Sequence, residues 1–173
     1  MRDAFDTLGL KARFDIDGAE LDRVVRHLLA ELHPHRGGNA ESQSNAGTMF
    51  AKQGEINHAY DQLREPTTRA ELLMQRRNQS VASQPSPALL SRVFEQREVI
   101  EQAIARRDSI ELSDCVCAAR ARQAELVGVL TAHFAAHASQ GAAPVTNVAQ
   151  VLQELKYLNK MVERGQQSLD DFE

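Results

Sequence analysis

The sequence has no tryptophan, few other aromatic residues, only two cysteines and no long apolar run. A membrane-spanning helix needs about 18 or more consecutive apolar residues, so no membrane segment is predicted. The first ten residues, MRDAFDTLGL, contain two aspartates where a secretory signal would have basic and apolar residues. Transit peptides are also poor in acidic residues. We therefore expect a cytoplasmic protein.

The chain also lacks a strong excess of charge of either sign. Its 20 Lys and Arg against 24 Asp and Glu give a net charge of −4. A general nucleic-acid-binding protein presents a basic surface, so nucleic acid is excluded as a partner. The hydrophobic share of 42% is ordinary for a globular protein, and 173 residues suffice for one or two small domains with a core.

The motifs of common enzymes and metal sites are missing as well. The sequence contains no glycine-rich phosphate loop, no HExxH and no GxSxG. Cys115 and Cys117 are too close in sequence for an easy disulfide and too few for a zinc site, and His33 and His35 have no acidic or cysteine ligand at a typical spacing. We therefore predict no catalytic residue, no metal site and no cofactor.

Apolar residues recur at helical spacing along nearly the whole chain, whereas strand-length alternation is almost absent. Two prolines end helices in the N-terminal part, because a proline inside a helix removes a backbone hydrogen bond. The pattern predicts a short helix or turn in 1–10, a helix from Asp17-Gly18 to His33-Pro34, a polar loop over 36–47, a helix over 49–63 before Pro66, and a helical turn over 69–73.

Residues 76–87, RRNQSVASQPSP, have no periodicity and contain two prolines, which is typical of a linker. Three amphipathic segments follow, near 87–106, 109–138 and 146–168, and helices with short connections fold as an antiparallel bundle. The sequence thus predicts an all-α protein with an N-terminal helical domain over 1–75, a linker over 76–87 and a three-helix domain over 88–173.

Particular strings in the N-terminal part resemble a J domain. They are the opening FDTLGL, the His33-Pro34-His35 tripeptide after a helix, EINHAYDQLREP over 55–66 and RAELL over 69–73. More closely, the whole chain is similar to the HscB family, the J-type co-chaperones of iron–sulfur cluster assembly. The resemblance implies a J domain, with its helical hairpin, followed by a three-helix bundle that binds the scaffold protein.

The same resemblance implies two protein partners. The J domain would dock on an ATP-driven chaperone of the HscA/DnaK type and stimulate its ATPase, and the bundle would deliver an IscU-like scaffold protein. The residues expected at the chaperone are His33, Pro34 and His35, together with Arg23, Arg26 and Arg36.

His35 stands where the family has the aspartate of its His-Pro-Asp signature. An imidazole is mostly neutral at pH 7 and is never an anion, so it cannot form a charge-assisted bidentate pair with a guanidinium. Loss of one partner of such a pair costs about 2–5 kcal/mol. In addition, three arginines and three acidic residues cancel between Glu20 and Arg36. Two hypotheses stay open: a working co-chaperone, or a degenerate J-domain protein that binds a client or scaffold without stimulating ATP hydrolysis.

The first bundle helix has two apolar stripes on a helical wheel. One contains Leu89 and Ile100 and is expected in the core. The other, about 80–100° away, is half apolar and half charged, which predicts a position at the edge of the bundle; its members are Leu90, Phe94, Arg97 and Glu101.

On the last helix, Tyr157 lies opposite the expected buried row and is predicted to point outward near Met161. The resemblance assigns scaffold binding to Leu90, Phe94 and Tyr157, with Arg97 and Glu98 as charged neighbours, while Ser91 replaces an apolar family position. The alternative is that Leu90 and Phe94 only widen the core stripe and that Tyr157 is a lone surface aromatic.

Overall fold

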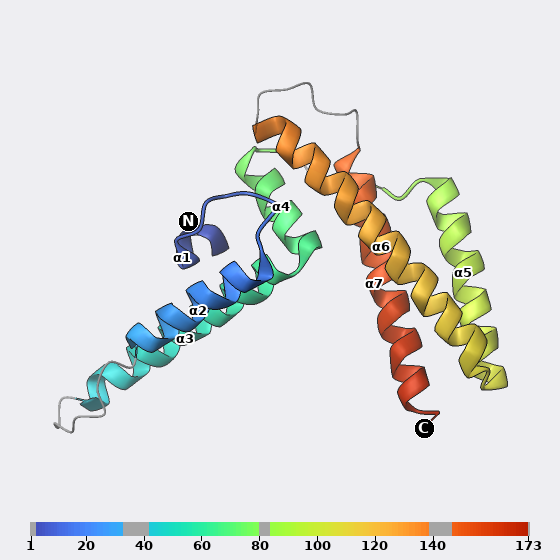
Figure 1. Cartoon of the computed structure of the whole chain (residues 1–173), viewed down its shortest axis with the longest axis horizontal. Helices are drawn as coiled ribbons and strands as arrows, with labels where there is room; N and C mark the ends of the chain where they lie inside the picture. The colour runs from blue at the N-terminus through green and yellow to red at the C-terminus, as the bar shows by residue number, and fades with distance from the viewer. Residues whose placement is uncertain (1–2, 33–41, 80–83, 139–146, 173) are drawn as a thin grey trace. The chain divides into compact units, whose positions relative to one another are not determined.

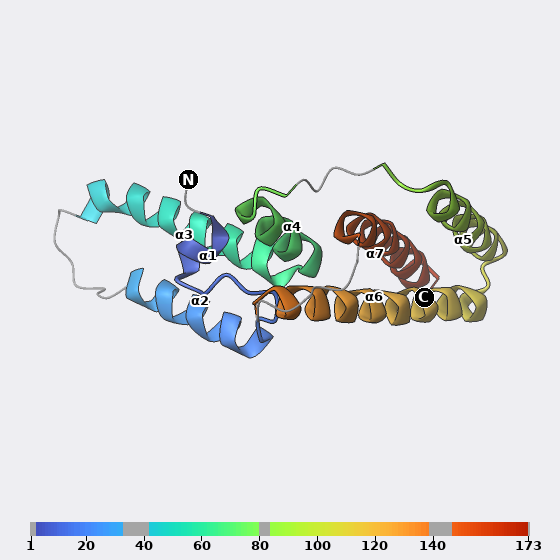
Figure 2. The ribbon, with the colours of Figure 1, turned by 90° about the horizontal axis from the view of Figure 1, so that it is seen from above.

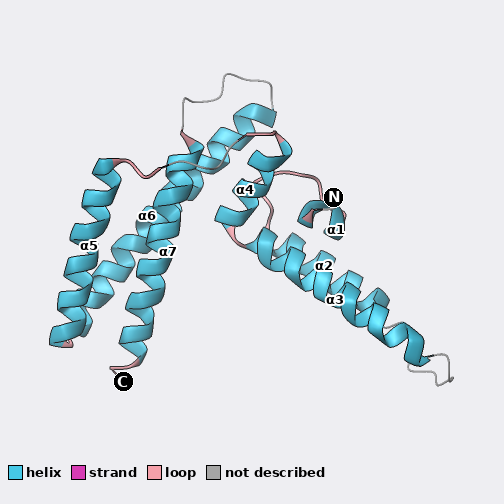
Figure 3. Ribbon diagram, turned by 180° about the vertical axis from the view of Figure 1, so that it is seen from behind, coloured by secondary structure: helices cyan, strands magenta, loops and turns pink. Residues whose placement is uncertain are grey.

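The computed structural model describes residues 3–32, 42–79, 84–138 and 147–172, and within these ranges all regular structure is helical (Figures 1 and 3). The all-α prediction is therefore confirmed. The helices are α1 (Ala4–Leu8), α2 (Gly18–Leu32), α3 (Ser42–Arg64), α4 (Pro66–Arg76), α5 (Pro87–Arg106), α6 (Ser109–Ala138) and α7 (Val148–Asp170).

The chain divides into two compact units, Met1–Arg77 and Asn78–Glu173. The first contains α1 to α4 and the second contains α5 to α7. The division falls within the predicted linker, 76–87, of which residues 80–83 lie outside the described part.

In the first unit, α2 and α3 lie side by side as a helical hairpin, and α1 packs against α3 (Figure 2). The α2 helix begins at Gly18, where the Asp17 carboxylate accepts a hydrogen bond from the Ala19 amide at 3.3 Å. Apolar side chains from all four helices and from the α1–α2 connection are buried; they include Phe5, Leu8, Phe14, Leu21, Val25, Ile56, Leu63 and Leu73.

Two boundaries in this unit differ from the prediction. The α3 helix begins at Ser42, so the loop predicted over 36–47 is wrong for residues 42–47, and residues 36–41 lie outside the described part. The sequence of residues 42–47, SQSNAG, contains no apolar stripe, which is why periodicity missed this part of the helix. The α4 helix is also longer than the turn predicted over 69–73, because Pro66 occupies its first turn and Glu65 caps it.

The first and last helices of this unit are joined by Arg76. Its guanidinium makes ion pairs with Asp3 and Asp6 and lies 5.3 Å from the centre of the Phe5 ring. Asp3 is also the N-cap of α1, within a reciprocal capping box with Asp6. The hydrogen bond from Arg76 holds the pKa of Asp3 below its usual value of 3.8.

An Arg76→Met substitution is expected to lower the free energy of unfolding of the first unit by about 1 kcal/mol at pH 7, because these pairs are partly exposed. A depressed carboxylate pKa stabilises the fold above the unfolded pKa and is lost as the pH falls through the folded pKa. The difference between wild type and variant should therefore shrink below pH 3.8. Urea denaturation at pH 7 and below pH 3.8 checks this, with the exposed Lys52→Met as control. Equal stabilities of the wild type and Arg76→Met at pH 7 would contradict the prediction.

In the second unit, α5 and α6 have the predicted bounds, and α7 is displaced by two residues from the predicted 146–168. The α6 and α7 helices pack together most extensively, while α5 contacts both (Figure 1). Six apolar residues at helical spacing along α6 are buried: Leu112, Val116, Ala119, Leu126, Leu130 and Phe134.

Candidate functional site

The α5 helix presents two faces, as its stripes predict. Leu89 and Ile100 are buried against the bundle, with relative exposures of 4% and 3%. On the second stripe Leu90 is half-buried, while Phe94 is 65% exposed. The charged predicted neighbours of this stripe, Arg97 and Glu98, are exposed.

Every residue from 94 to 99 is exposed, so the middle of α5 contributes no buried side chain over this stretch. Gln96 falls at the helical position between Val93 and Ile100, where an apolar residue would complete the inner stripe. A pocket of about 160 Å³ lies at this level between the three helices. It is lined by Leu89, Arg92, Val93 and Gln96 of α5, Arg122 of α6, and Glu154, Tyr157 and Leu158 of α7.

The prediction that Tyr157 points outward from the bundle is wrong. Tyr157 is half-buried and lines this pocket. Periodicity along α7 predicts one buried row, whereas α7 packs against both α5 and α6. Met161 likewise packs against the core cluster of Ile100, Ala103 and Leu112.

The register of α5 and α7 brings Phe94 and Tyr157 to the same level. The two helices run in the same direction (Figures 1 and 3), and Glu101 of α5 pairs with Arg164 of α7 at 3.5 Å. Residues seven apart lie on the same face of a helix, and Phe94 and Tyr157 each precede one member of that pair by seven. They therefore lie on the facing edges of α5 and α7.

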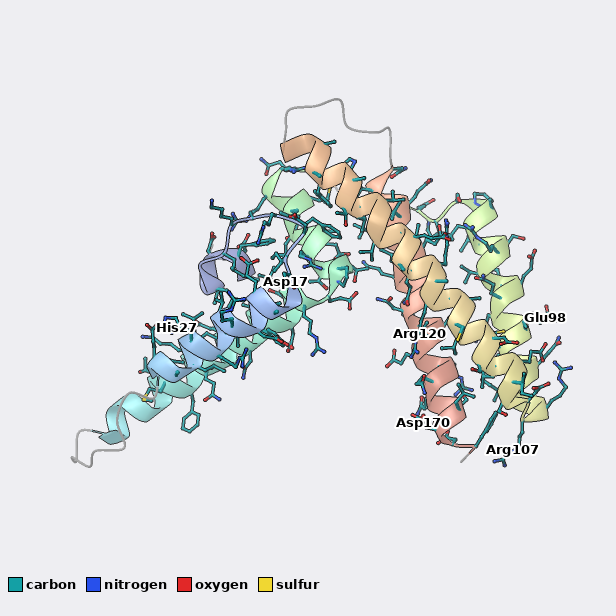
Figure 4. The ribbon with its side chains drawn as sticks, in the orientation of Figure 1. Asp17, His27, Glu98, Arg107, Arg120 and Asp170 are labelled. Carbon is teal, nitrogen blue, oxygen red and sulfur yellow. The ribbon has the colours of Figure 1, made fainter. Side chains whose placement is uncertain are left out.

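Four of the predicted scaffold-binding residues thus follow one side of α5, and the fifth lies beside them on α7. We call these residues, Leu90, Phe94, Arg97, Glu98 and Tyr157, the α5–α7 surface. Glu98 accepts a hydrogen bond from Gln102 at 3.3 Å, one turn further along the helix (Figure 4). The arrangement is an apolar patch bordered by charges.

Sequence analysis missed the polar bridge beneath this surface. The Glu154 carboxylate accepts a hydrogen bond from Nε of Arg122 at 2.9 Å and lies 3.5 Å from a terminal nitrogen of Arg92. Arg122 also pairs with Glu125 at 2.9 Å, and the hydrogen bond that it donates to Glu154 is the main cause of its raised pKa. The available signal was an acidic residue between two buried leucines, Leu152 and Leu155, of an amphipathic helix.

The predicted chaperone-binding residues are only partly placed. Arg23 and Arg26 are exposed on α2, and Nε of Arg26 donates to the backbone oxygen of Asp22 at 3.2 Å. They are three residues apart and therefore share a face; His27, one residue further, pairs with Glu31 at 3.3 Å (Figure 4). His33, Pro34, His35 and Arg36 lie outside the described residues.

Two residues of the J-domain-like strings have structural contacts. The Tyr60 hydroxyl donates to Asp22 at 2.8 Å and joins α3 to α2. The buried Arg69 donates to the backbone oxygen of Ile16 at 3.2 Å and lies 5.1 Å from the centre of the Phe14 ring. Burial lowers the pKa of Arg69. These contacts tie α3 to α2, and α4 to the segment that leads into α2.

In the described part of the chain, no three His, Cys, Asp or Glu residues are placed to hold a metal ion. Cys115 is half-buried and Cys117 is exposed. Burial is the main cause of the raised pKa of the Cys115 thiol.

Comparison with known proteins supports the same family for both units. Residues 85–164 match a family model described as the HSCB C-terminal oligomerisation domain. A co-chaperone protein HscB homolog of Bordetella petrii is 33% identical over 105 residues, which cover 58% of this chain and 61% of that protein. The homolog of Burkholderia mallei is 31% identical over 144 residues, covering 80% and 81%.

The Burkholderia match is longer than either unit and therefore extends over both. The match to the Bordetella protein spans only about three fifths of that relative's length. Among solved structures, the chaperone HscB from Vibrio cholerae superposes with a TM-score of 0.78 at 24% identity, covering 99% of this chain and 100% of that chain, and has the same fold.

The fold and the site define an all-α protein of two units, a J domain and a three-helix bundle, with an exposed side-chain surface as the candidate site. The chain belongs to the HscB family of co-chaperones. The predicted family resemblance and fold class are therefore confirmed.

Proposed function

We propose that this protein is a co-chaperone of iron–sulfur cluster assembly, which delivers an IscU-like scaffold protein to an ATP-driven chaperone of the HscA/DnaK type and stimulates its ATPase. The observation that carries the proposal is the 31% identity to a co-chaperone HscB homolog over a length that includes both units. A protein that brings two partners together needs both units, one for each partner. The proposed role is non-enzymatic, cytoplasmic and independent of a metal or cofactor.

The scaffold protein would bind at the α5–α7 surface. Phe94 is largely exposed, Leu90 and Tyr157 are half-buried beside it, and Arg97 and Glu98 supply polar contacts at the border. An exposed apolar patch with a charged rim is typical of a transient partner site. Among the described residues, no helix is both long and apolar enough to cross a membrane, so this patch is not part of a membrane span.

The chaperone would bind the J domain through His33, Pro34 and His35, with Arg23, Arg26 and Arg36 as basic neighbours. We propose residues 1–75 as this domain, 76–87 as the linker and 88–173 as the scaffold-binding bundle. A second candidate function rests on His35: without an anion at this position, the protein would bind scaffold but leave ATP hydrolysis unstimulated.

The steady-state ATPase rate of the HscA/DnaK-type chaperone distinguishes these functions when it is measured with the wild type and with His35→Asp. We expect the wild type to stimulate hydrolysis and His35→Asp to stimulate at least ten-fold more at limiting concentrations, because about 2 kcal/mol of charge-assisted binding is restored.

A Pro34→Ala variant serves as control for the integrity of the tripeptide. Stimulation by His35→Asp alone would favour the degenerate J domain. No stimulation by either protein, with scaffold binding retained, would contradict the proposed action on this class of chaperone.

A further inference from the structure

The attachment of α5 to the bundle is apolar at its ends and polar in its middle. Leu89 near the start of the helix, and Ile100 and Ala103 near its end, are buried. Between them Gln96 leaves the pocket of about 160 Å³ unfilled by an apolar side chain. The central turns of α5 therefore lack the continuous apolar seam that fixes most helices in a bundle.

Glu154 supplies the polar link at this level. It projects from α7, accepts a hydrogen bond from Arg122 of α6 at 2.9 Å and pairs with Arg92 of α5 at 3.5 Å. Its side chain is only 14% exposed, so water and salt screen these interactions less than those of a surface pair. One carboxylate thus joins all three helices.

The position of this bridge relates it to the α5–α7 surface. Tyr157 follows Glu154 by three residues on α7, and Phe94 follows Arg92 by two on α5. All of the bridging residues and Tyr157 line the same pocket. Any change in the separation of α5 and α7 at Glu154 also changes the separation of Phe94 and Tyr157.

We infer that Glu154 is a positioning residue for partner binding, which holds the middle of α5 at the distance from α7 at which Phe94 and Tyr157 form one surface. The inference rests on the proposed binding of a scaffold protein by this surface. Removal of the carboxylate leaves Arg92 and Arg122 as two like charges at one pocket. Arg122 keeps its pair with Glu125, so the attraction that is lost is the one that holds Arg92 of α5 against α7. The central turns of α5 would then move outward, and binding would have to restore them.

The test uses Glu154→Gln, which keeps the size of the side chain and removes its charge. We expect the affinity for a purified IscU-like scaffold protein to fall about ten-fold, in the range of couplings within one ion-pair network. Amide hydrogen exchange of residues 93–99 should accelerate, while that of α6 stays unchanged. Isothermal titration calorimetry and exchange mass spectrometry measure the two effects on the full chain.

Glu125→Gln is the matched control. Glu125 pairs with the same Arg122 at 2.9 Å, but its side chain is 65% exposed and the pair lies within α6. This control should bind the scaffold as the wild type does. Arg92→Met cuts the bridge from the α5 side at a half-exposed residue, and should reproduce Glu154→Gln even where the latter folds poorly.

Rescue separates positioning from a general loss of stability. Adding Gln96→Leu to Glu154→Gln supplies the missing apolar side chain, and should restore both slow exchange in α5 and most of the affinity. Phe94→Ala is measured in parallel to report on the binding surface itself.

Two outcomes distinguish a failure of this inference from a failure of the proposed function on which it rests. Wild-type affinity and exchange in both Glu154→Gln and Arg92→Met, with Phe94→Ala defective, would show that the bridge does not position α5. Normal binding by Phe94→Ala would instead contradict the proposed surface, while faster exchange in Glu154→Gln would still support the role of the bridge in fixing α5.

Discussion

Replacing both Leu90 and Phe94 by alanine is expected to weaken binding of an IscU-like scaffold protein about 100-fold, because the most exposed apolar side chain of the α5–α7 surface and its neighbour are lost together. Large apolar and aromatic residues at the centre of an interface often contribute about 2 kcal/mol or more each, and neighbouring effects do not add fully. Phe94 is 65% exposed in the free protein, so its removal should cost little folding stability.

Val99→Ala is a suitable control for this experiment. Val99 is an exposed apolar residue of the same helix, 41% exposed, and lies about 140° around α5 from Phe94. Calorimetry with the scaffold protein should find wild-type affinity for the control. The converse variant, Ser91→Leu, enlarges the patch and should bind more tightly. Affinity of the Leu90/Phe94 double variant within two-fold of wild type would exclude this surface as the binding site.

The distinction between the two stripes of α5 could be predicted from sequence because it depends on the geometry of a single helix. Once residues are placed 100° apart, Leu89 and Ile100 fall on one side and Phe94 on another, whatever the rest of the fold. The bounds of α5 and α6 were predictable for a related reason, since Pro87 and the short connection after Arg106 interrupt the pattern locally.

The position of Tyr157 could not be derived in the same way. The side of α7 that carries Tyr157 faces away from α6 but toward α5. Whether Tyr157 is exposed therefore depends on how the three helices pack together. The Arg92–Glu154–Arg122 bridge could not be derived for the same reason: its members are 30 or more residues apart, and the place of Glu154 between two buried leucines does not identify its partners. The start of α3 at Ser42 was missed because residues 42–47 contain no apolar residues at helical spacing.

The J-domain-like strings contained more structural information than their pattern indicates. Tyr60 and Arg69 were recognised as members of a family string, and the structure explains them through contacts with Asp22 and Ile16. A buried guanidinium requires partners: the backbone oxygen of Ile16 accepts one of its hydrogen bonds, and the Phe14 ring makes a cation–π contact with it. Resemblance identified these positions, but their physical role depends on the tertiary structure.

A Gly165→Leu substitution is expected to destabilise the bundle by about 3 kcal/mol, at the upper end of the usual cost of overpacking a core. A Cβ atom at Gly165 would lie 2.5 Å from Cγ2 of Val116, closer than real side chains approach. Val116 is 3% exposed and β-branched, so it cannot rotate away into solvent. Glycine is needed here for the close approach of α6 and α7, and thermal or urea denaturation of the variant measures its contribution.

Gly165→Ala in two backgrounds tests the cause of this effect. In the wild type the alanine Cβ meets Val116, and we expect a net loss of about 1–2 kcal/mol despite the better helix propensity of alanine. In a Val116→Ala background the obstructing methyl groups are gone, so the same substitution should become stabilising by up to about 1 kcal/mol.

Gly128→Ala on α6 provides the control, since a Cβ there meets no atom within 4 Å. It should stabilise the protein in either background through helix propensity alone. If the change in the free energy of unfolding reverses sign between the two backgrounds at Gly165 but not at Gly128, the effect is assigned to contact with Val116. The same loss at Gly165 with and without Val116 would contradict that assignment, because the cost would then come from something other than the spacing of α6 and α7.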